Sequence, residues 1–147
     1  MREMGCVQVM IIDGLISDEW KIMNIFIVED SPIVQGILTV ELGRIEGVTI
    51  CGIAREPAEA ILSIQKSKPD LVILDIVLYD GNGFEVLKKI RSEGSDVKVM
   101  ILTNYSYQHY RVISREMGAD LFFDKSIELE KAIQAVRELA CNNNRIH

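Results

Sequence analysis

Short apolar runs recur along the chain, and each is followed by a segment with helical spacing. The run at 71–74 reads LVIL, four apolar residues in a row. Such a segment has no solvent-facing side, so it must be covered on both faces, as in a strand of a parallel sheet. Four further runs have the same character and complete a set of five expected strands, at 24–30, 48–54, 97–104 and 121–125.

The segments between these runs carry apolar residues three and four positions apart, which is typical of amphipathic helices. This spacing is found at 33–45, 57–64, 84–90, 113–117 and 129–140. Gly47, Gly94 and Gly118 follow three of the segments and are expected to end those helices. The alternation predicts a doubly wound α/β domain, with a five-stranded parallel sheet, right-handed crossovers and helices on both faces.

Polar side chains stand where the expected strands end. They are Glu29 and Asp30 after the first strand, Asp75 after the third, Thr103 at the end of the fourth and Lys125 after the fifth. The carboxyl ends of parallel strands meet at one edge of a sheet, which is where ligands of such folds bind. The sequence therefore predicts that these side chains converge on one site.

Composition and charge exclude several classes of function. The chain has 147 residues, a length typical of one domain, and a net charge of -6. Nucleic-acid binding needs clustered Lys and Arg, so no direct contact with nucleic acid is expected. The three cysteines and two histidines are not spaced as zinc ligands.

The two ends of the chain fall outside the expected fold. We expect a main domain at 23–141, a short tail at 142–147 and an N-terminal extension at 1–22. The extension is interpreted as an extra strand, a partner-binding arm or a segment upstream of the true start. It lacks the pattern of a signal peptide, and no apolar run reaches the roughly 18 residues of a membrane span. We therefore expect a cytoplasmic protein without membrane contact.

The three expected carboxylates indicate a site that binds a metal ion and a phosphoryl group. Glu29, Asp30 and Asp75 would repel one another at adjacent strand ends unless a cation lies among them. Oxygen ligands that are partly open to water suit Mg²⁺. Lys125 adds a positive charge and Thr103 a hydroxyl donor, and together with Mg²⁺ these groups neutralise the oxygens of a phosphoryl group in transfer. Asp75 is left as the nucleophile.

These motifs resemble the receiver domain of bacterial two-component response regulators. The resemblance covers about 23–140 and rests on FIVEDS, LVILDIVLYDGNGFEVL, VMILTN and LFFDKS. It implies a flavodoxin-like fold with strand order 2-1-3-4-5. It also implies that Asp75 accepts a phosphoryl group from a phosphohistidine, and that Glu29 and Asp30 hold Mg²⁺ together with Asp75 and the backbone carbonyl of Val77.

The same resemblance implies roles for three further residues and for the partners. Lys125 pairs with phosphoryl oxygens, Thr103 donates a hydrogen bond to one of them, and Phe122 is the aromatic switch residue. The partners are a sensor histidine kinase, a histidine phosphotransfer protein, or both, and a downstream protein that binds the fourth helix, fifth strand and fifth helix. A homodimer is a further possibility. The implied protein is a stand-alone regulator, not an enzyme beyond its own phosphorylation and dephosphorylation.

Several positions depart from the family pattern. Val77 offers no polar group to steer an attacking water and Tyr105 is bulky, so we expect slower self-hydrolysis than in chemotaxis-type regulators. Asn104 replaces a small residue that usually follows the threonine, which is expected to narrow phosphoryl access. Ser126 and Tyr79 stand where the family often has proline.

Three alternatives are weighed against this interpretation. A phosphatase of the haloacid dehalogenase type needs a second aspartate at the position of Val77. A flavin-binding domain needs a phosphate-cradling loop where this chain has DSPIVQG. A receiver-like docking or dimerising module that takes no phosphate is the serious competitor. The tyrosines at 105, 107 and 110 indicate either a partly exposed amphipathic turn or a partner-docking surface.

Overall fold

The computed structural model describes residues 21–144, whose core is a five-stranded parallel sheet. The strands are β1 (Met23–Val28), β2 (Val48–Ala54), β3 (Leu71–Leu74), β6 (Lys98–Thr103) and β7 (Leu121–Asp124). They lie in the order β2-β1-β3-β6-β7, and each pairing is parallel. The expected fold and its strand order 2-1-3-4-5 are confirmed. This order places the carboxyl ends of β1, β3 and β6 side by side.

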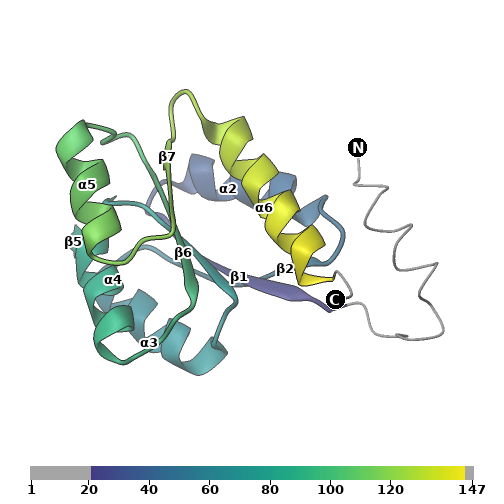
Figure 1. The fold of residues 1–147 in the computed structure, drawn as a ribbon, viewed down its shortest axis with the longest axis horizontal. Coiled ribbons are helices and arrows are strands. Elements are labelled where there is room, and N and C mark those ends of the chain that lie inside the picture. Colours follow the sequence, from purple (N-terminus) through teal and green to yellow (C-terminus); the bar gives the residue numbers. More distant parts are fainter. Residues whose placement is uncertain (1–20, 145–147) are drawn as a thin grey trace.

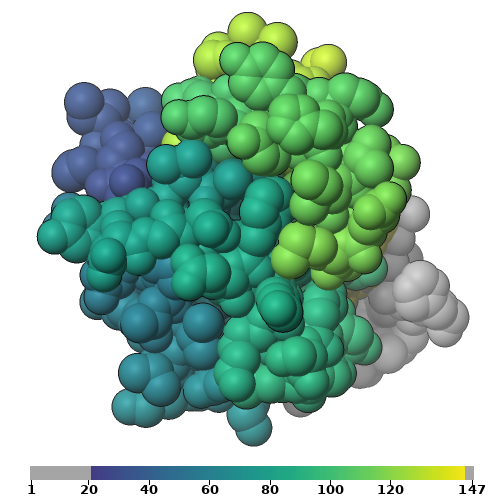
Figure 2. All heavy atoms as spheres, turned by 90° about the vertical axis from the view of Figure 1, so that its left-hand side faces the viewer, coloured from purple at the N-terminus to yellow at the C-terminus, as the bar shows by residue number. Residues whose placement is uncertain are grey.

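Helices cover both faces of the sheet (Figure 1). On one face lie α2 (Pro32–Gly43) and α6 (Leu129–Asn143); on the other lie α3 (Pro57–Ser67), α4 (Gly83–Ser92) and α5 (Gln108–Glu116). Figure 2 views the second face, where the teal atoms of α4 adjoin the green atoms of α5. Because each helix layer buries one side of the sheet, the central strands have no solvent face, which explains their uninterrupted apolar sequence.

Successive residues of β1 belong to two separate cores. Ile25 and Ile27 join the apolar cluster beneath α2 and α6, whereas Phe26 and Val28 join the cluster beneath α3 and α4. All four side chains are at most 2% exposed. This alternation follows from the period of two in a strand. Burial on both sides fixes the position of β1, and with it the position of the acidic pair that follows.

The helix ends are determined by local chemistry. The Ser31 hydroxyl accepts the Val34 N–H at the start of α2, and Asn82 and Glu85 form a reciprocal capping box at the start of α4. Gly47, Gly94 and Gly118 all have positive φ, as expected of residues that follow helices. However, α2 ends at Gly43, earlier than the 33–45 spacing predicts. The spacing extends too far because the apolar Ile45 is buried although it lies in the turn after the helix.

A short hairpin follows β3 and was not predicted. Its strands β4 (Val77–Leu78) and β5 (Gly81–Asn82) pair antiparallel. The connecting turn places Asp80 at φ 56° and Gly81 at φ 149°. Both residues are of types that tolerate positive φ. The hairpin fixes the segment that leaves Asp75.

The two ends of the described chain meet. The Asn144 side chain accepts the Lys21 N–H at 2.7 Å and donates to the Lys21 carbonyl at 3.0 Å. Helix α6 runs through Asn143, so the first two residues of the expected tail at 142–147 are helical. The expected extension lies almost wholly outside the described residues. Among residues 21–144, no helix is long and apolar enough to cross a membrane.

Two glycine substitutions test this packing. Gly52 of β2 pairs with Phe26, and a Cβ there would overlap the Phe26 ring, so Gly52→Ala should lower the free energy of unfolding by about 1–3 kcal/mol. Gly36 lies inside α2 with open space around it, so Gly36→Ala should raise that free energy by about 0.5–1 kcal/mol. Urea unfolding measures both. Equal effects of the two substitutions would contradict the contact between Gly52 and Phe26.

Candidate functional site

Three carboxylates meet at the carboxyl edge of the sheet. Glu29 and Asp30 follow β1, and Asp75 follows β3. One oxygen of each lies within 4.8 Å of the others. Glu29 is 2% and Asp75 6% exposed, whereas Asp30 is half-buried. The structure therefore brings together the acidic residues that the sequence predicted, and it leaves Asp30 as the member most open to water.

Lys125 lies among these carboxylates. Its Nζ is 2.7 Å from Glu29 Oε1 and 2.6 Å from Asp75 Oδ2, and its side chain is only 10% exposed. Burial lowers the pKa of Lys125, but the hydrogen bonds to Asp75 and Glu29 outweigh it and raise the pKa above its usual value. Burial also raises the pKa of Glu29, against the opposing hydrogen bond from Lys125. The ammonium group thus offsets part of the charge of the two most buried carboxylates.

Backbone contacts hold the two buried carboxylates in place. The Ser31 N–H donates to Glu29 Oε2 at 2.9 Å, and the Val77 N–H donates to Asp75 Oδ1 at 3.3 Å. Gly83 begins α4 directly against Asp75, since a Cβ at Gly83 would overlap the Asp75 carbonyl oxygen. The close approach of this helix explains the glycine in the DGNG segment. Val77 itself starts the β4–β5 hairpin, and a role for its carbonyl as a metal ligand stays a prediction.

Thr103 and Lys125 are tied together through the main chain. Thr103 ends β6 with no exposed surface, and its Oγ1 accepts the Tyr105 N–H at 3.2 Å. The Thr103 carbonyl accepts the Lys125 N–H at 2.8 Å. The hydroxyl group of the first residue and the ammonium group of the second are therefore carried by neighbouring strand ends.

Phe122 is half-buried on β7 and contacts the core beneath α3 and α4. The guanidinium carbon of Arg111 lies 4.6 Å from the centroid of its ring, a cation–π geometry. Arg111 also donates to Glu128 Oε1 at 3.3 Å. The expected switch residue thus packs against a positioned arginine of α5, while its movement on phosphorylation stays a prediction.

Sequence reasoning missed one buried acid beside the site. Asp124, immediately before Lys125, is 8% exposed and accepts hydrogen bonds from Ser106 and Ser126. Hydrogen bonds from the Ser106 and Ser126 hydroxyls lower the pKa of Asp124 to about 2. The D-K-S order in LFFDKS is the only available signal, because a D-x-S spacing favours a local turn. Its contact with Ser106 depends on the tertiary fold.

The tyrosines at the start of α5 stand partly in solvent. Tyr105 is 42% and Tyr107 65% exposed, whereas Tyr110 is half-buried with its ring centroid 6.4 Å from that of Phe84. His109 lies against Tyr110 at 4.2 Å between centroids. The cluster has both a packed and an exposed part, and its use as a docking surface stays a prediction.

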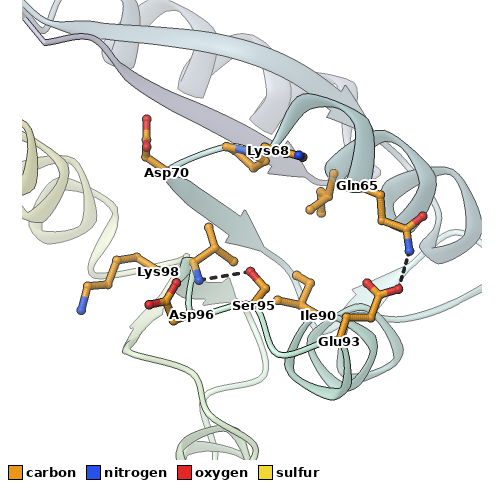
Figure 3. A pocket seen from close by; sticks show the side chains of 11 residues that line it. Gln65, Lys68, Asp70, Ile90, Glu93, Ser95, Asp96 and Lys98 are labelled. Carbon is orange, nitrogen blue, oxygen red and sulfur yellow. Dashed lines mark hydrogen bonds between the residues drawn. The ribbon is translucent and has the colours of Figure 1, made fainter.

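A separate groove of about 530 Å³ lies away from this chemistry. Figure 3 shows it between the ends of α3 and α4, where Gln65 donates a hydrogen bond to Glu93. Asp70 and Lys98 line it at the amino ends of β3 and β6, the edge of the sheet opposite to Asp75. No residue of the acidic site lines the groove, so we assign it no part in the chemistry.

The acidic cluster fits a hard divalent cation. Carboxylate oxygens are the ligands that Mg²⁺ prefers, and the half-buried Asp30 leaves room for the waters that Mg²⁺ retains. Three acids against one lysine also leave the site short of positive charge. Both the donor type and the charge balance therefore agree with the expected metal.

Removing the Lys125 ammonium tests this charge balance. Lys125→Ala leaves Glu29 and Asp75 without a cation, so the free energy of unfolding at neutral pH should fall by about 3 kcal/mol, as when a buried ion pair is broken. Millimolar Mg²⁺ should restore part of the loss by supplying positive charge. Urea unfolding with and without Mg²⁺ measures both effects.

Lys89→Ala is the matched control. Lys89 forms an exposed pair with Glu93 at 3.8 Å, so the control should lose no more than about 1 kcal/mol and should not respond to Mg²⁺ differently from the wild type. If the Lys125 variant behaved like this control, the proposed neutralising role of Lys125 would be wrong.

Comparison with known proteins gives a consistent result. Residues 25–137 match the family model of the response regulator receiver domain. The chain is 29% identical over 120 residues to the "Probable C4-dicarboxylate response regulator DctR" of Bacillus subtilis, which covers 82% of this chain and 52% of that protein. It is 28% identical over 122 residues to the DNA-binding transcriptional activator DevR/DosR of Mycobacterium tuberculosis, covering 83% and 56%.

The chain spans about half the length of these curated relatives. The expectation of a stand-alone regulator therefore stays a prediction.

Solved structures share the fold. The response regulator domain of Thermotoga maritima CheB superposes with a TM-score of 0.74 at 19% identity, covering 86% of this chain and 99% of that one. The CheX-CheY-BeF3-Mg+2 complex from Borrelia burgdorferi gives a TM-score of 0.73 at 24% identity, covering 80% and 88%. Together with the family match, the fold and the strand-end acids lead to one conclusion: this chain belongs to the receiver domains of two-component response regulators.

Proposed function

We propose that this receiver accepts a phosphoryl group on Asp75 from the phosphohistidine of a sensor kinase or phosphotransfer protein, with Mg²⁺ bound at Glu29 and Asp30. The observation that carries the proposal is the double contact of Lys125 Nζ with Asp75 and Glu29. This contact places a cation beside Asp75, the carboxylate that directly follows the central strand β3. A nucleophile at that point is held rigidly, which favours reaction with a positioned phosphorus atom.

The transfer is an exchange of one bond for another. An Asp75 carboxylate oxygen attacks phosphorus, the P–N bond of the phosphohistidine breaks, and the imidazole leaves with the electron pair and takes up a proton. The product is an acyl phosphate on Asp75. Lys125 turns from Asp75 toward the new phosphoryl oxygens, and the Thr103 hydroxyl donates to one of them. The metal, when bound, supplies positive charge to the same oxygens.

The partner that delivers the phosphoryl group is proposed to contact α2. This helix starts two residues after Asp30 and exposes an apolar stripe of Ile33, Ile37 and Val40 at 76%, 40% and 54%. These residues follow helical spacing, and Gly36 between them leaves open space for a side chain of the partner. A helix with its own apolar face fits such a surface and would bring its histidine to the acidic edge.

The output is proposed to pass through the surface formed by α5, β7 and α6. A groove of about 350 Å³ lies at the α5–β7 part of this surface, lined by Arg111, Arg115, Asp120 and Phe122 among others. The buried Ser114 Oγ lines it too and has no hydrogen-bond partner in the described structure. The two arginines favour an acidic partner segment. The chain catalyses no reaction in this proposal beyond its own phosphorylation and dephosphorylation, and it acts by protein contact.

The related CheX-CheY complex holds an analogue of a phosphoryl group. That complex contains BeF3 and Mg+2, and beryllofluoride bound to a carboxylate has the shape of a phosphoryl group. At 24% identity that structure speaks for the fold alone, so the assignment of the acceptor rests on the geometry around Asp75.

The direct test is the intact mass after incubation with Mg²⁺ and acetyl phosphate. The wild type should gain one phosphoryl group, and Asp75→Asn should gain none because the amide is a poor nucleophile. Asp96→Asn, an aspartate at the opposite end of the sheet, should behave as the wild type does. A wild type that neither gains mass nor binds Mg²⁺ would contradict the proposal and favour a docking module that takes no phosphate.

The lifetime of the acyl phosphate generates a second prediction. Val77 is 43% exposed beside Asp75 and has no polar group to orient water. Val77→Asn should therefore accelerate phosphate loss about tenfold, equivalent to about 1.4 kcal/mol of barrier. Decay of the phosphorylated mass after removal of the donor gives the rate. Val77→Ala removes even more bulk than Val77→Asn but adds no polar group, and it should stay within about twofold of the wild type. Equal acceleration in both variants would show that bulk alone sets the lifetime.

A further inference from the structure

Asp124 is a buried acid that the proposed transfer does not use. Its two carboxylate oxygens face different segments: Oδ2 accepts the Ser106 hydroxyl at 2.5 Å, while Oδ1 accepts the Ser126 N–H at 2.8 Å and the Ser126 hydroxyl at 2.5 Å. Among the described residues no cation lies within ion-pair distance of it. Hydroxyl and amide donors alone therefore stabilise its charge.

The two segments that Asp124 joins each carry a residue of the phosphoryl site. Ser106 lies three residues after Thr103, in the loop between β6 and α5. Ser126 immediately follows Lys125 in the turn between β7 and α6. The Asp124 side chain thus connects the loop that follows Thr103 with the turn that contains Lys125.

A second layer of contacts holds Asp124 itself. Glu128 Oε1 accepts the Asp124 N–H at 2.9 Å and an Arg111 N–H at 3.3 Å, and Arg111 Nε donates to the Ser106 carbonyl at 3.2 Å. The Asp124 carbonyl accepts the Glu128 N–H at 2.7 Å. The network closes on itself, so neither loop can shift without breaking hydrogen bonds to the other.

We propose that Asp124 is a positioning residue for phosphoryl transfer. Its carboxylate holds Lys125 in a fixed position relative to the loop after Thr103, so that Lys125 and Thr103 reach the same phosphoryl group. This inference rests on the proposed function and adds to it a residue that contacts neither the phosphoryl group nor the metal. Hydrogen bonds from Ser106 and Ser126 lower the pKa of Asp124, so at neutral pH the carboxylate is ionised and able to accept all three hydrogen bonds.

Ser106→Ala is the sharpest perturbation. It removes the direct hydrogen bond from the loop after Thr103 to Asp124, but it leaves the contacts through Arg111, the turn at Ser126 and every residue of the acidic cluster in place. Asp124→Ala removes both links and leaves several donors unsatisfied, so it should act more strongly. Ser106→Thr keeps the hydroxyl and should restore function. Ser92→Ala removes an exposed helix hydroxyl that bonds only the Lys89 carbonyl and is the matched control.

The experiment measures the rate of phosphorylation of the full chain by acetyl phosphate, the Mg²⁺ dissociation constant and the urea midpoint for each variant. We expect Ser106→Ala to slow phosphorylation between about tenfold and a hundredfold, the range for a small misplacement of reacting groups. Mg²⁺ affinity should stay within about twofold of the wild type. Ser106→Thr and Ser92→Ala should phosphorylate at the wild-type rate.

Two results would overturn the inference. The first is a wild-type rate in Ser106→Ala, since the direct contact between Asp124 and the loop after Thr103 would then have no effect on the chemistry. The second is a loss of rate in Ser106→Ala that Ser106→Thr does not restore, or one that is accompanied by a proportional loss of Mg²⁺ affinity and a proportional fall in the urea midpoint. Either pattern would show general destabilisation and not a loss of positioning. If Asp124→Ala does not fold, the serine variants still decide. A wild type that is not phosphorylated overturns the proposed function and this inference together, whereas the other results leave the proposed function intact.

Discussion

The structure depends on the repulsion of three carboxylates held at one edge of a parallel sheet. Like charges at this distance destabilise one another, and two of the three are almost fully buried, which adds the cost of desolvation. The Lys125 ammonium offsets part of both effects through contacts with Glu29 and Asp75. The remaining deficit of positive charge is the reason that we expect the site to bind a divalent cation. In the proposed function, the transferred phosphoryl group would add further negative charge at Asp75, and a bound divalent cation would offset it.

The rest of the fold keeps these charges from moving apart. The acids end strands that are buried on both faces, so the strands cannot relax the repulsion by shifting. Helix α4 begins against the Asp75 carbonyl at Gly83, and the β4–β5 hairpin returns the chain there. On the other side, the Asp124 network joins the loop after Thr103 to the turn after Lys125. The proposed transfer thus uses a site whose acidic part is rigid and whose phosphoryl-binding part is joined by a few polar contacts.

Much of this arrangement could be predicted from the sequence because its signals are local. Apolar runs such as 71–74 are too short for helices and have no solvent face, so they identify buried strands, and a strand end fixes where its next residue lies. The convergence of Glu29, Asp30 and Asp75 followed directly. The end of α2 was misjudged because Ile45 continues the helical spacing while lying in a turn. Spacing alone does not distinguish these two ways of burying an apolar side chain.

The contacts that escaped prediction are those between segments far apart in sequence. Ser106 is a loop residue and Asp124 ends a strand, and nothing in their local sequence marks a contact between them. Only the pairing of β6 with β7 brings the two residues together. The same holds for Arg111 over Phe122, where a helix residue meets a strand residue through tertiary packing. The capping box of Asn82 and Glu85, by contrast, is visible as an N-x-x-E spacing and was available from the sequence.

The most direct test of the central claim is fluorine NMR of the chain with beryllofluoride, with and without Mg²⁺. The claim is that Asp75, Lys125 and a divalent cation form one phosphoryl-binding unit. It predicts protein-bound fluoride signals that appear only when Mg²⁺ is present and that are absent from Asp75→Asn. Bound signals that persist without Mg²⁺ or in the Asp75 variant, or no bound signal under any condition, would contradict it.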